Sequence, residues 1–273
     1  MQTMSDVEIN TIANEILAAL GTGGAITPFT ARPGGLTAEG ASRVLARLHA
    51  AFLARGETIV GRKIGFTNRG IWAQYGVDAP NWGFVTDRTV CDLAARPVLP
   101  LATLSEPRIE PEIMFRFARV PAPGMDDAAL LDCIDWLAAG YEIVQSLYPQ
   151  WKFGVPDTAA QNAMHGALLI GPRHAVAARR ADWLRELPRF TVDLARDGEV
   201  VDRGGGASVL EGPLSTLRYL MQRLADDPRH PSLAAGEIVS TGTLTKAFPV
   251  KPGETWTATF AGILLAPITL RFA

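Results

Sequence analysis

The stretch Arg108-Ile-Glu-Pro-Glu-Ile-Met-Phe-Arg-Phe117 decides the fold class, because its apolar residues occupy every second position. These residues are Ile109, Pro111, Ile113, Phe115 and Phe117. A period of two is that of a β-strand, so the pattern predicts a strand over 108–120 with one buried face. Proline has no amide hydrogen to give to a neighbouring strand, so Pro111 indicates the edge of a sheet.

Two carboxylates share the other face of this predicted strand. At a rise of about 3.3 Å per residue, Glu110 and Glu112 have Cα atoms roughly 6.6 Å apart. One interpretation is a solvated strand face. The other is a functional acidic pair, which is favoured by the apolar flanks, by Pro111 and by a third isolated acid, Glu142, in the strand-like run Gly140-Tyr-Glu-Ile-Val144.

The rest of the chain predicts an α+β fold. Helical periodicity marks 9–20, 37–55, 126–139 and 211–225, whereas short β-like runs occupy 58–66, 140–145, 167–170, 190–195, 200–201, 254–263 and 267–272. Asp197-Gly198 predicts a two-residue hairpin turn. We therefore expect a small helical N-terminal region, 1–57, that leads into a β-rich catalytic body, 58–273, in one structural unit.

Composition excludes several classes of function. The 273 residues are 48% hydrophobic and 20% charged, which is typical of a globular protein. A formal net charge of -2 gives no field that would recruit nucleic acid or an anionic membrane. Cys91 and Cys133 make no disulfide framework, the four histidines fit no zinc motif, and neither a signal peptide nor a membrane span is evident. We expect a cytoplasmic protein.

The three acids suggest a metal site. If Glu142 converges on Glu110 and Glu112, three hard oxygen ligands suit Mg²⁺ or Mn²⁺. Three carboxylates and one divalent cation leave a charge of -1, so an anionic substrate needs another cation nearby. Lys63 is the candidate, since the glycines around it, Gly61 and Gly65, allow close approach of a ligand. The alternative is a surface lysine in a strand.

Six motifs in this order resemble one known family. They are Gly61-Arg-Lys-Ile-Gly-Phe-Thr67, Gly76-Val-Asp-Ala-Pro-Asn-Trp-Gly83, Arg108-Ile-Glu-Pro-Glu112, Glu142-Ile-Val144, Asp157-Thr-Ala-Ala-Gln-Asn162 and Thr241-Gly-Thr243. Together they resemble the 2-keto-4-pentenoate hydratase and 4-oxalocrotonate decarboxylase group of the fumarylacetoacetate hydrolase superfamily. The resemblance extends from about Ile26 to the C-terminus.

The resemblance implies a fold and a site. The fold is a mixed β-sandwich roll, and a divalent cation lies on Glu110, Glu112 and Glu142. A 2-oxo acid binds this cation through its carboxylate and keto oxygens, with Lys63 beside it. Such a cation stabilises an enolate, which serves hydration, decarboxylation or C–C hydrolysis alike. Substrate contacts are expected from Gly65, from Lys152 and from Thr241, Gly242 and Thr243.

Two positions depart from the hydratase pattern. Asn81 stands where the group has an acid, and Met164-His165 stands where the group has a serine followed by a small residue. Hydratase/lyase activity on a small 2-oxo or 2-hydroxydienoic acid in aromatic catabolism is the first hypothesis. The second is an acylpyruvate hydrolase in which His165 activates water, although His165 could equally be a hydrogen-bonded core residue. The third is an inactive subunit that binds a 2-oxo acid. Exposed sheet edges favour a homo-oligomer.

Overall fold

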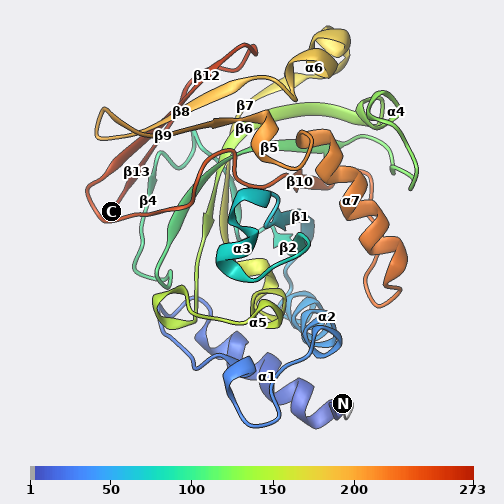
Figure 1. Ribbon diagram of the computed structural model, residues 1–273, viewed down its shortest axis with the longest axis vertical. Helices are drawn as coiled ribbons and strands as arrows, with labels where there is room; N and C mark the ends of the chain where they lie inside the picture. Colours follow the sequence, from blue (N-terminus) through green and yellow to red (C-terminus); the bar gives the residue numbers. More distant parts are fainter. Residues whose placement is uncertain (1–3) are drawn as a thin grey trace.

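The computed structural model describes residues 4–273, which form two β-sheets with helices around them (Figure 1). The helices of this part are α1 (Asp6–Ala19), α2 (Ala38–Ala54), α3 (Trp72–Tyr75), α4 (Asp127–Leu131), α5 (Val155–Ala160), α6 (Arg180–Glu186) and α7 (Pro213–Asp226). The strands are β1 (Ile59–Gly65), β2 (Asn81–Thr86), β3 (Val90–Asp92), β4 (Val98–Leu99), β5 (Arg108–Phe117), β6 (Ile134–Val144), β7 (His165–Ala175), β8 (Thr191–Arg196), β9 (Glu199–Gly205), β10 (Ile238–Ser240), β11 (Phe248–Pro249), β12 (Thr255–Ala261) and β13 (Ile268–Phe272).

The larger sheet is strongly curved. Its strand order is β2-β1-β10-β5-β6-β7-β3, with β11 also paired to β5. Strands β2 and β3 therefore lie at opposite ends of this order, yet only residues 87–89 separate them in the chain. Because the four Cα–Cα steps from Thr86 to Val90 span at most about 14 Å, the two ends of the sheet must come back together. Leu168 on β7 accordingly donates its backbone N–H to the carbonyl of Thr89, at 2.7 Å.

Strand β5 confirms the predicted period of two, although it ends at Phe117 rather than at 120. Ile109, Ile113, Phe115 and Phe117 are fully buried in the main core. The prediction that Pro111 lies at the edge of a sheet is wrong. Strand β5 is an interior strand, with β6 on one side and β10 and β11 on the other. Pro111 is tolerated there because β10 pairs with residues 114–116 and β11 with residues 108–109, which leaves Pro111 in the gap between them.

The smaller sheet has the strand order β4-β13-β12-β8-β9 and packs against the same core. Trp256 and Leu270 of this sheet lie in one hydrophobic cluster with Phe115 of β5. Strands β8 and β9 form the predicted hairpin. Asp197 and Gly198 both have positive φ, 51° and 88°, as the tight turn requires.

Two helices precede the first strand. Ser5 caps α1 through a capping box with Glu8, and the Thr37 side chain caps α2. In Figure 1 both helices lie at the lower end of the molecule next to α5, with which they share a second hydrophobic cluster. The Asp157 carboxylate on α5 accepts hydrogen bonds from the backbone N–H groups of Phe29 and Thr30, which ties this end to the body.

The predicted helix over 126–139 is wrong beyond its first turns. Helix α4 ends at Leu131, and β6 begins at Ile134 and runs between β5 and β7. Most of β6 is buried on both faces, so it shows no alternation of apolar and polar residues. Its backbone pairing on both sides outweighs the local preference for a helix.

No helix within residues 4–273 has the length and hydropathy needed to cross a membrane.

Helix α7 was predicted over 211–225. It begins at Pro213, a residue type that suits the first helical position, and ends at Asp226.

Candidate active site

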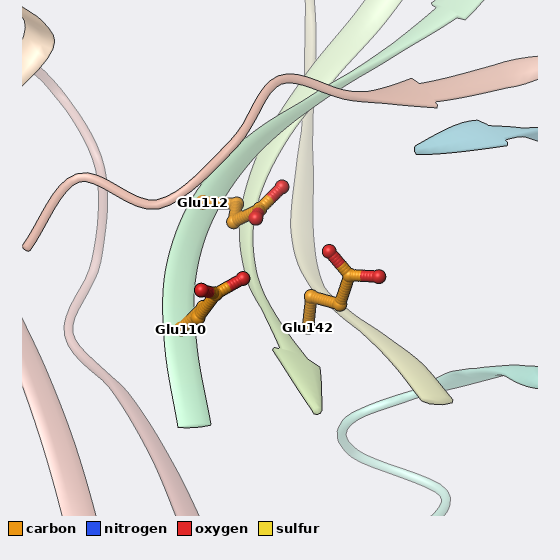
Figure 2. Close-up of side chains that lie close together, drawn as sticks. All are labelled: Glu110, Glu112 and Glu142. Carbon is orange, nitrogen blue, oxygen red and sulfur yellow. The ribbon is translucent and has the colours of Figure 1, made fainter. Parts of the chain in front are cut away.

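The structure brings the three predicted carboxylates together. Glu110 and Glu112 project from the same face of β5, and the antiparallel register places Glu142 of β6 directly opposite Glu110 (Figure 2). One carboxylate oxygen from each residue lies within 4.8 Å of the others. This face of β5 is therefore an acidic cluster rather than a solvated surface, since Glu112 and Glu142 are fully buried.

Lys63 supplies the positive charge beside this cluster. It projects from β1, is 2% exposed, and its Nζ lies 3.1 Å from Glu142 Oε2. The same ammonium group donates a hydrogen bond of 3.0 Å to the carbonyl of Ala163. Residues Asn162, Ala163 and Met164 all have positive φ, and this left-handed turn is what aims that carbonyl at Lys63. The surface-lysine alternative is excluded.

Burial and mutual repulsion set the pKa values of the acids. Burial, followed by the charge of nearby Glu142, raises the pKa of Glu112 well above its usual value. Burial likewise raises the pKa of Glu110, to about 7, against the opposing effect of Lys63. Burial alone would also raise the pKa of Glu142, but Lys63 and His165 outweigh it and the net shift is downward. Three carboxyl groups thus crowd around one lysine, and Glu110 and Glu112 bind protons more readily than ordinary glutamates do.

His165 contacts the cluster from the far side. It is the first residue of β7, and its Nδ1 lies 2.8 Å from Glu142 Oε1. Its Nε2 lies 2.9 Å from the Thr89 hydroxyl, so both ring nitrogens have partners. The imidazole is 5% exposed and does not line the cavity at Lys63. This placement matches a hydrogen-bonded residue that fixes the orientation of Glu142.

Glu112 is held by groups of the segment that follows β10. The Ser240 hydroxyl and the backbone N–H of Gly242 both donate to Glu112 Oε2, the latter at 2.9 Å. The other oxygen, Oε1, is buried and has no hydrogen-bond partner within residues 4–273. An unpartnered buried carboxylate oxygen is costly, and in a set of three carboxylates it suits a hard divalent cation such as Mg²⁺ or Mn²⁺. The residues present therefore fit such an ion.

Asn81 and Gly65 lie beside Lys63 in the same cavity. Asn81 Nδ2 donates to the Thr158 hydroxyl at 2.9 Å, while its Oδ1 is buried without a partner among the described residues. Gly65 makes room for both neighbours, since a Cβ atom there would lie 2.5 Å from Asn81 Oδ1 and 3.3 Å from Lys63 Nζ. An unpartnered amide oxygen next to an ammonium group can accept a hydrogen bond from water or a substrate.

The remaining predicted contacts divide into two groups. Thr243 and Gly65 line the cavity, and Gly242 reaches the cluster through its amide. The Thr241 hydroxyl donates to the carbonyl of Ile113, at 2.9 Å, and the residue does not line the cavity. Lys152 is exposed and lies outside the cavity lining as well.

The cavity itself measures about 60 Å³, and its lining is mainly apolar. The aromatic residues that line it are Phe66, Tyr75, Trp151 and Phe153. Tyr75 stacks on Phe153 with ring centroids 5.7 Å apart. Sequence reasoning missed Ser240, Thr89 and the Ala163 carbonyl. Ser240 directly precedes the Thr241-Gly-Thr243 motif and could have been found there, whereas the left-handed turn at Ala163 leaves no clear signal in the sequence.

Comparison with known proteins agrees with this geometry. A mixed α/β fold that gathers three carboxylates and a lysine beside a small cavity has the features of an enzyme active site. A family model described as fumarylacetoacetate (FAA) hydrolase C-terminal matches residues 74–269. The chain belongs to this family.

Curated relatives narrow the class further. A 4-oxalocrotonate decarboxylase of Pseudomonas sp. (strain CF600) is 33% identical over 220 residues, which cover 80% of this chain and 79% of the relative. A 2-hydroxyhexa-2,4-dienoate hydratase of Comamonas testosteroni is 28% identical over 262 residues, which cover 95% and 97%. Among solved structures, 4-oxalocrotonate decarboxylase from Pseudomonas putida G7, complexed with magnesium and adipate, matches with a TM-score of 0.89 at 29% identity, covering 100% of both chains. The protein is an enzyme of this hydratase and decarboxylase group, as its motifs predicted.

Proposed function

We propose that this enzyme binds Mg²⁺ or Mn²⁺ at Glu110, Glu112 and Glu142 and acts as a hydratase/lyase on a small 2-oxo or 2-hydroxydienoic acid. The observation that carries the proposal is the convergence of these three carboxylates within 4.8 Å of one another, beside a cavity that Lys63 also lines. When bound, the cation supplies Lewis-acid stabilisation of the enolate form of such a substrate, a role worth several kcal/mol.

The residues of the chain supply charge and position. The Lys63 ammonium, held by Glu142 and the Ala163 carbonyl, offsets the negative charge of a substrate carboxylate at the inner end of the cavity. Asn81 Oδ1 accepts a hydrogen bond from the water that adds to the substrate in hydration. The aromatic lining of the cavity surrounds the uncharged part of the substrate and keeps bulk water out.

An acylpyruvate hydrolase with His165 as the water-activating base has less support. Both ring nitrogens of His165 have partners, Glu142 and Thr89, and the ring does not line the cavity. We therefore propose that His165 is a positioning residue for Glu142.

The proposal includes features that concern the whole molecule. The two sheets would form the mixed β-sandwich roll of the family, preceded by a helical region over 1–57 and continuous with a catalytic body over 58–273. We expect a cytoplasmic homo-oligomer that takes part in aromatic-compound breakdown.

Calorimetry on metal-stripped protein tests the metal site. We expect Mn²⁺ to bind the wild type and to bind Glu110→Gln at least about tenfold more weakly, because one anionic ligand is lost. Glu199→Gln is the matched control, since Glu199 is exposed on β9 and makes no ion pair within residues 4–273. Oxalate, which mimics the enolate of pyruvate, should bind only in the presence of Mn²⁺. Equal Mn²⁺ affinity in all three proteins would refute the proposed ligands.

A product assay then separates the reactions. Incubation with 2-hydroxypenta-2,4-dienoate should give the 4-hydroxy-2-oxo acid, and a 4-oxalocrotonate-type dicarboxylate should release CO₂ if decarboxylation is the reaction. An acylpyruvate should stay intact. Formation of pyruvate and a second carboxylic acid from the acylpyruvate would instead support the hydrolase.

A further inference from the structure

A second pocket shares no lining residue with the cavity at Lys63 and includes His165, which contacts Glu142. Its lining includes His165, Thr89 and Asn162, together with residues from the ends of α1 and α2 and from the segment 96–104. We call it the rear pocket. It measures about 320 Å³, against about 60 Å³ for the cavity at Lys63, so it has room for a small molecule. Nothing in the proposed reaction uses this space.

The rear pocket carries an excess of positive charge. Arg55, Arg88 and Arg96 line it, and Glu57 is the acid among its lining residues. Within residues 4–273 none of the three guanidinium groups forms a salt bridge, whereas most other arginines of this part do. Arg88 is directed by a long hydrogen bond, of 3.4 Å, to the backbone carbonyl of Arg55 at the end of α2. Three positive charges and one negative charge leave an excess of two.

A buried hydroxyl group without a partner points to the same ligand. Thr86 lines the rear pocket, is 3% exposed, and its Oγ1 has no hydrogen-bond partner among the described residues. A buried hydroxyl group left unpaired costs about 1–3 kcal/mol, which an acceptor atom in the pocket would recover. An anionic oxygen near Thr86 would accept a hydrogen bond from its hydroxyl group and would also offset the positive charge of the arginines.

Part of the remaining lining is apolar. It includes Leu20, Phe52, Phe84, Leu99 and Leu104. A bare inorganic anion would leave this surface uncovered, whereas a ligand with a hydrocarbon body would bury it and gain about 25 cal/mol for each Å².

We propose that the rear pocket binds a small organic dianion, a dicarboxylate with a short hydrocarbon body, at a site distinct from the acidic cluster. The guanidinium groups of Arg88 and Arg96 bind its carboxylates, Thr86 Oγ1 donates a hydrogen bond, and the apolar lining contacts its methylene groups. The inference stands independently of the reaction, because it uses neither the metal ligands nor Lys63.

The test is calorimetric titration of the full chain with adipate after the acidic cluster has been saturated with Mn²⁺ and oxalate. We expect one adipate per chain. The double variant Arg88→Ala/Arg96→Ala should bind it at least about tenfold more weakly, because two charge-assisted contacts are lost. Arg223→Ala is the matched control, since Arg223 is exposed on α7 and makes no salt bridge within residues 4–273. It should bind like the wild type.

Three further measurements keep the proposal open to refutation. Thr86→Val, which keeps the shape and removes the hydroxyl group, should weaken adipate binding, and Glu110→Gln should leave it unchanged. Inorganic phosphate binding as tightly as adipate would overturn the assignment to a ligand with a hydrocarbon body. Loss of binding in Glu110→Gln would place adipate at the acidic cluster, and no loss in the arginine variant would show that adipate does not bind in the rear pocket. A change of oligomeric state in the arginine variant, with no adipate bound by the wild type, would assign the arginines to a contact between subunits.

Discussion

Replacing Lys63 with methionine should destabilise the metal-free enzyme by about 3–5 kcal/mol at pH 7.5, the usual cost of removing one member of a buried ion pair. The Nζ of Lys63 lies 3.1 Å from Glu142 Oε2, and at an effective dielectric constant of about 20 two unit charges at that distance attract by about 5 kcal/mol. Part of this attraction is offset by the desolvation of the ammonium group. Methionine keeps the unbranched shape, so the change removes the charge and the hydrogen bond to the Ala163 carbonyl without opening a large cavity.

The size of the effect should depend on pH and on the divalent cation. Without Lys63 the pKa of Glu142 loses the main influence that lowers it, so it rises. The destabilisation is therefore present at high pH and diminishes as the pH falls through this raised pKa and the carboxyl group becomes protonated. Saturating Mg²⁺ should also reduce it, because the cation restores positive charge beside the carboxylates.

Urea denaturation followed by tryptophan fluorescence would measure these differences in the free energy of unfolding, at pH 7.5 and pH 5.5, with EDTA or with Mg²⁺. Lys152→Met is the control, since Lys152 is an exposed lysine outside the cavity lining, and it should change the free energy by less than about 0.5 kcal/mol. A loss below about 1 kcal/mol in Lys63→Met at pH 7.5 with EDTA, or a loss that grows toward pH 5.5, would refute the reasoning.

Three other changes test separate parts of the structure. Glu112→Gln should weaken Mn²⁺ binding at least about tenfold in calorimetry while preserving the far-ultraviolet circular dichroism spectrum, and unchanged affinity would exclude Glu112 as a ligand. Gly242→Ala should destabilise by about 3 kcal/mol in urea, because its φ is +97° and a Cβ would lie 1.9 Å from Thr67 Oγ1, whereas Gly253→Ala, with φ +91° and no atom within 4 Å, should cost only about 1 kcal/mol. Equal costs would show that the close approach is irrelevant. Burial lowers the pKa of His230 in the folded protein to about 4. As the pH falls below about 6.5, the unfolded chain therefore binds a proton at His230 before the folded protein does. The free energy of unfolding consequently decreases between about pH 6.5 and pH 4. In His230→Gln the decline in unfolding free energy over this range should be smaller by up to about 2 kcal/mol, and an equal decline in both proteins would contradict it.

The sequence was informative where the two faces of a strand differ in chemistry, with apolar side chains on one face and charged side chains on the other. The alternation from Ile109 to Phe117 predicted both the buried face of β5 and the common direction of Glu110 and Glu112. The ordered motifs then predicted the family. The same reasoning failed for β6, because a strand buried on both faces has no alternation to detect.

The groups that orient Lys63 and Glu142 were harder to predict than Lys63 and the three glutamates themselves. Lys63 is aimed by a backbone carbonyl, that of Ala163, and this contact depends on positive φ at an alanine, which no local rule anticipates. The placement of His165 was also undetermined, because the sequence shows an imidazole near a strand but not which face of Glu142 it occupies. Only the pairing of β6 with β7 places it behind the carboxylate.

The gap in the ladder beside Pro111 explains how an interior strand can carry two carboxylates. Strand β10 ends at Ser240, and the chain then follows β5 without forming a regular strand: the N–H groups of Thr241 and Leu244 donate to the carbonyls of Ile113 and Pro111. This irregular path turns the Ser240 hydroxyl and the Gly242 amide toward Glu112. In a regular strand such amides would pair with carbonyls of the neighbouring strand, and the buried carboxylate would have no hydrogen-bond donors. The proline that would interrupt an ordinary interior strand is therefore compatible with this one, because the interruption lies where the acidic cluster needs hydrogen-bond donors that the ladder does not use.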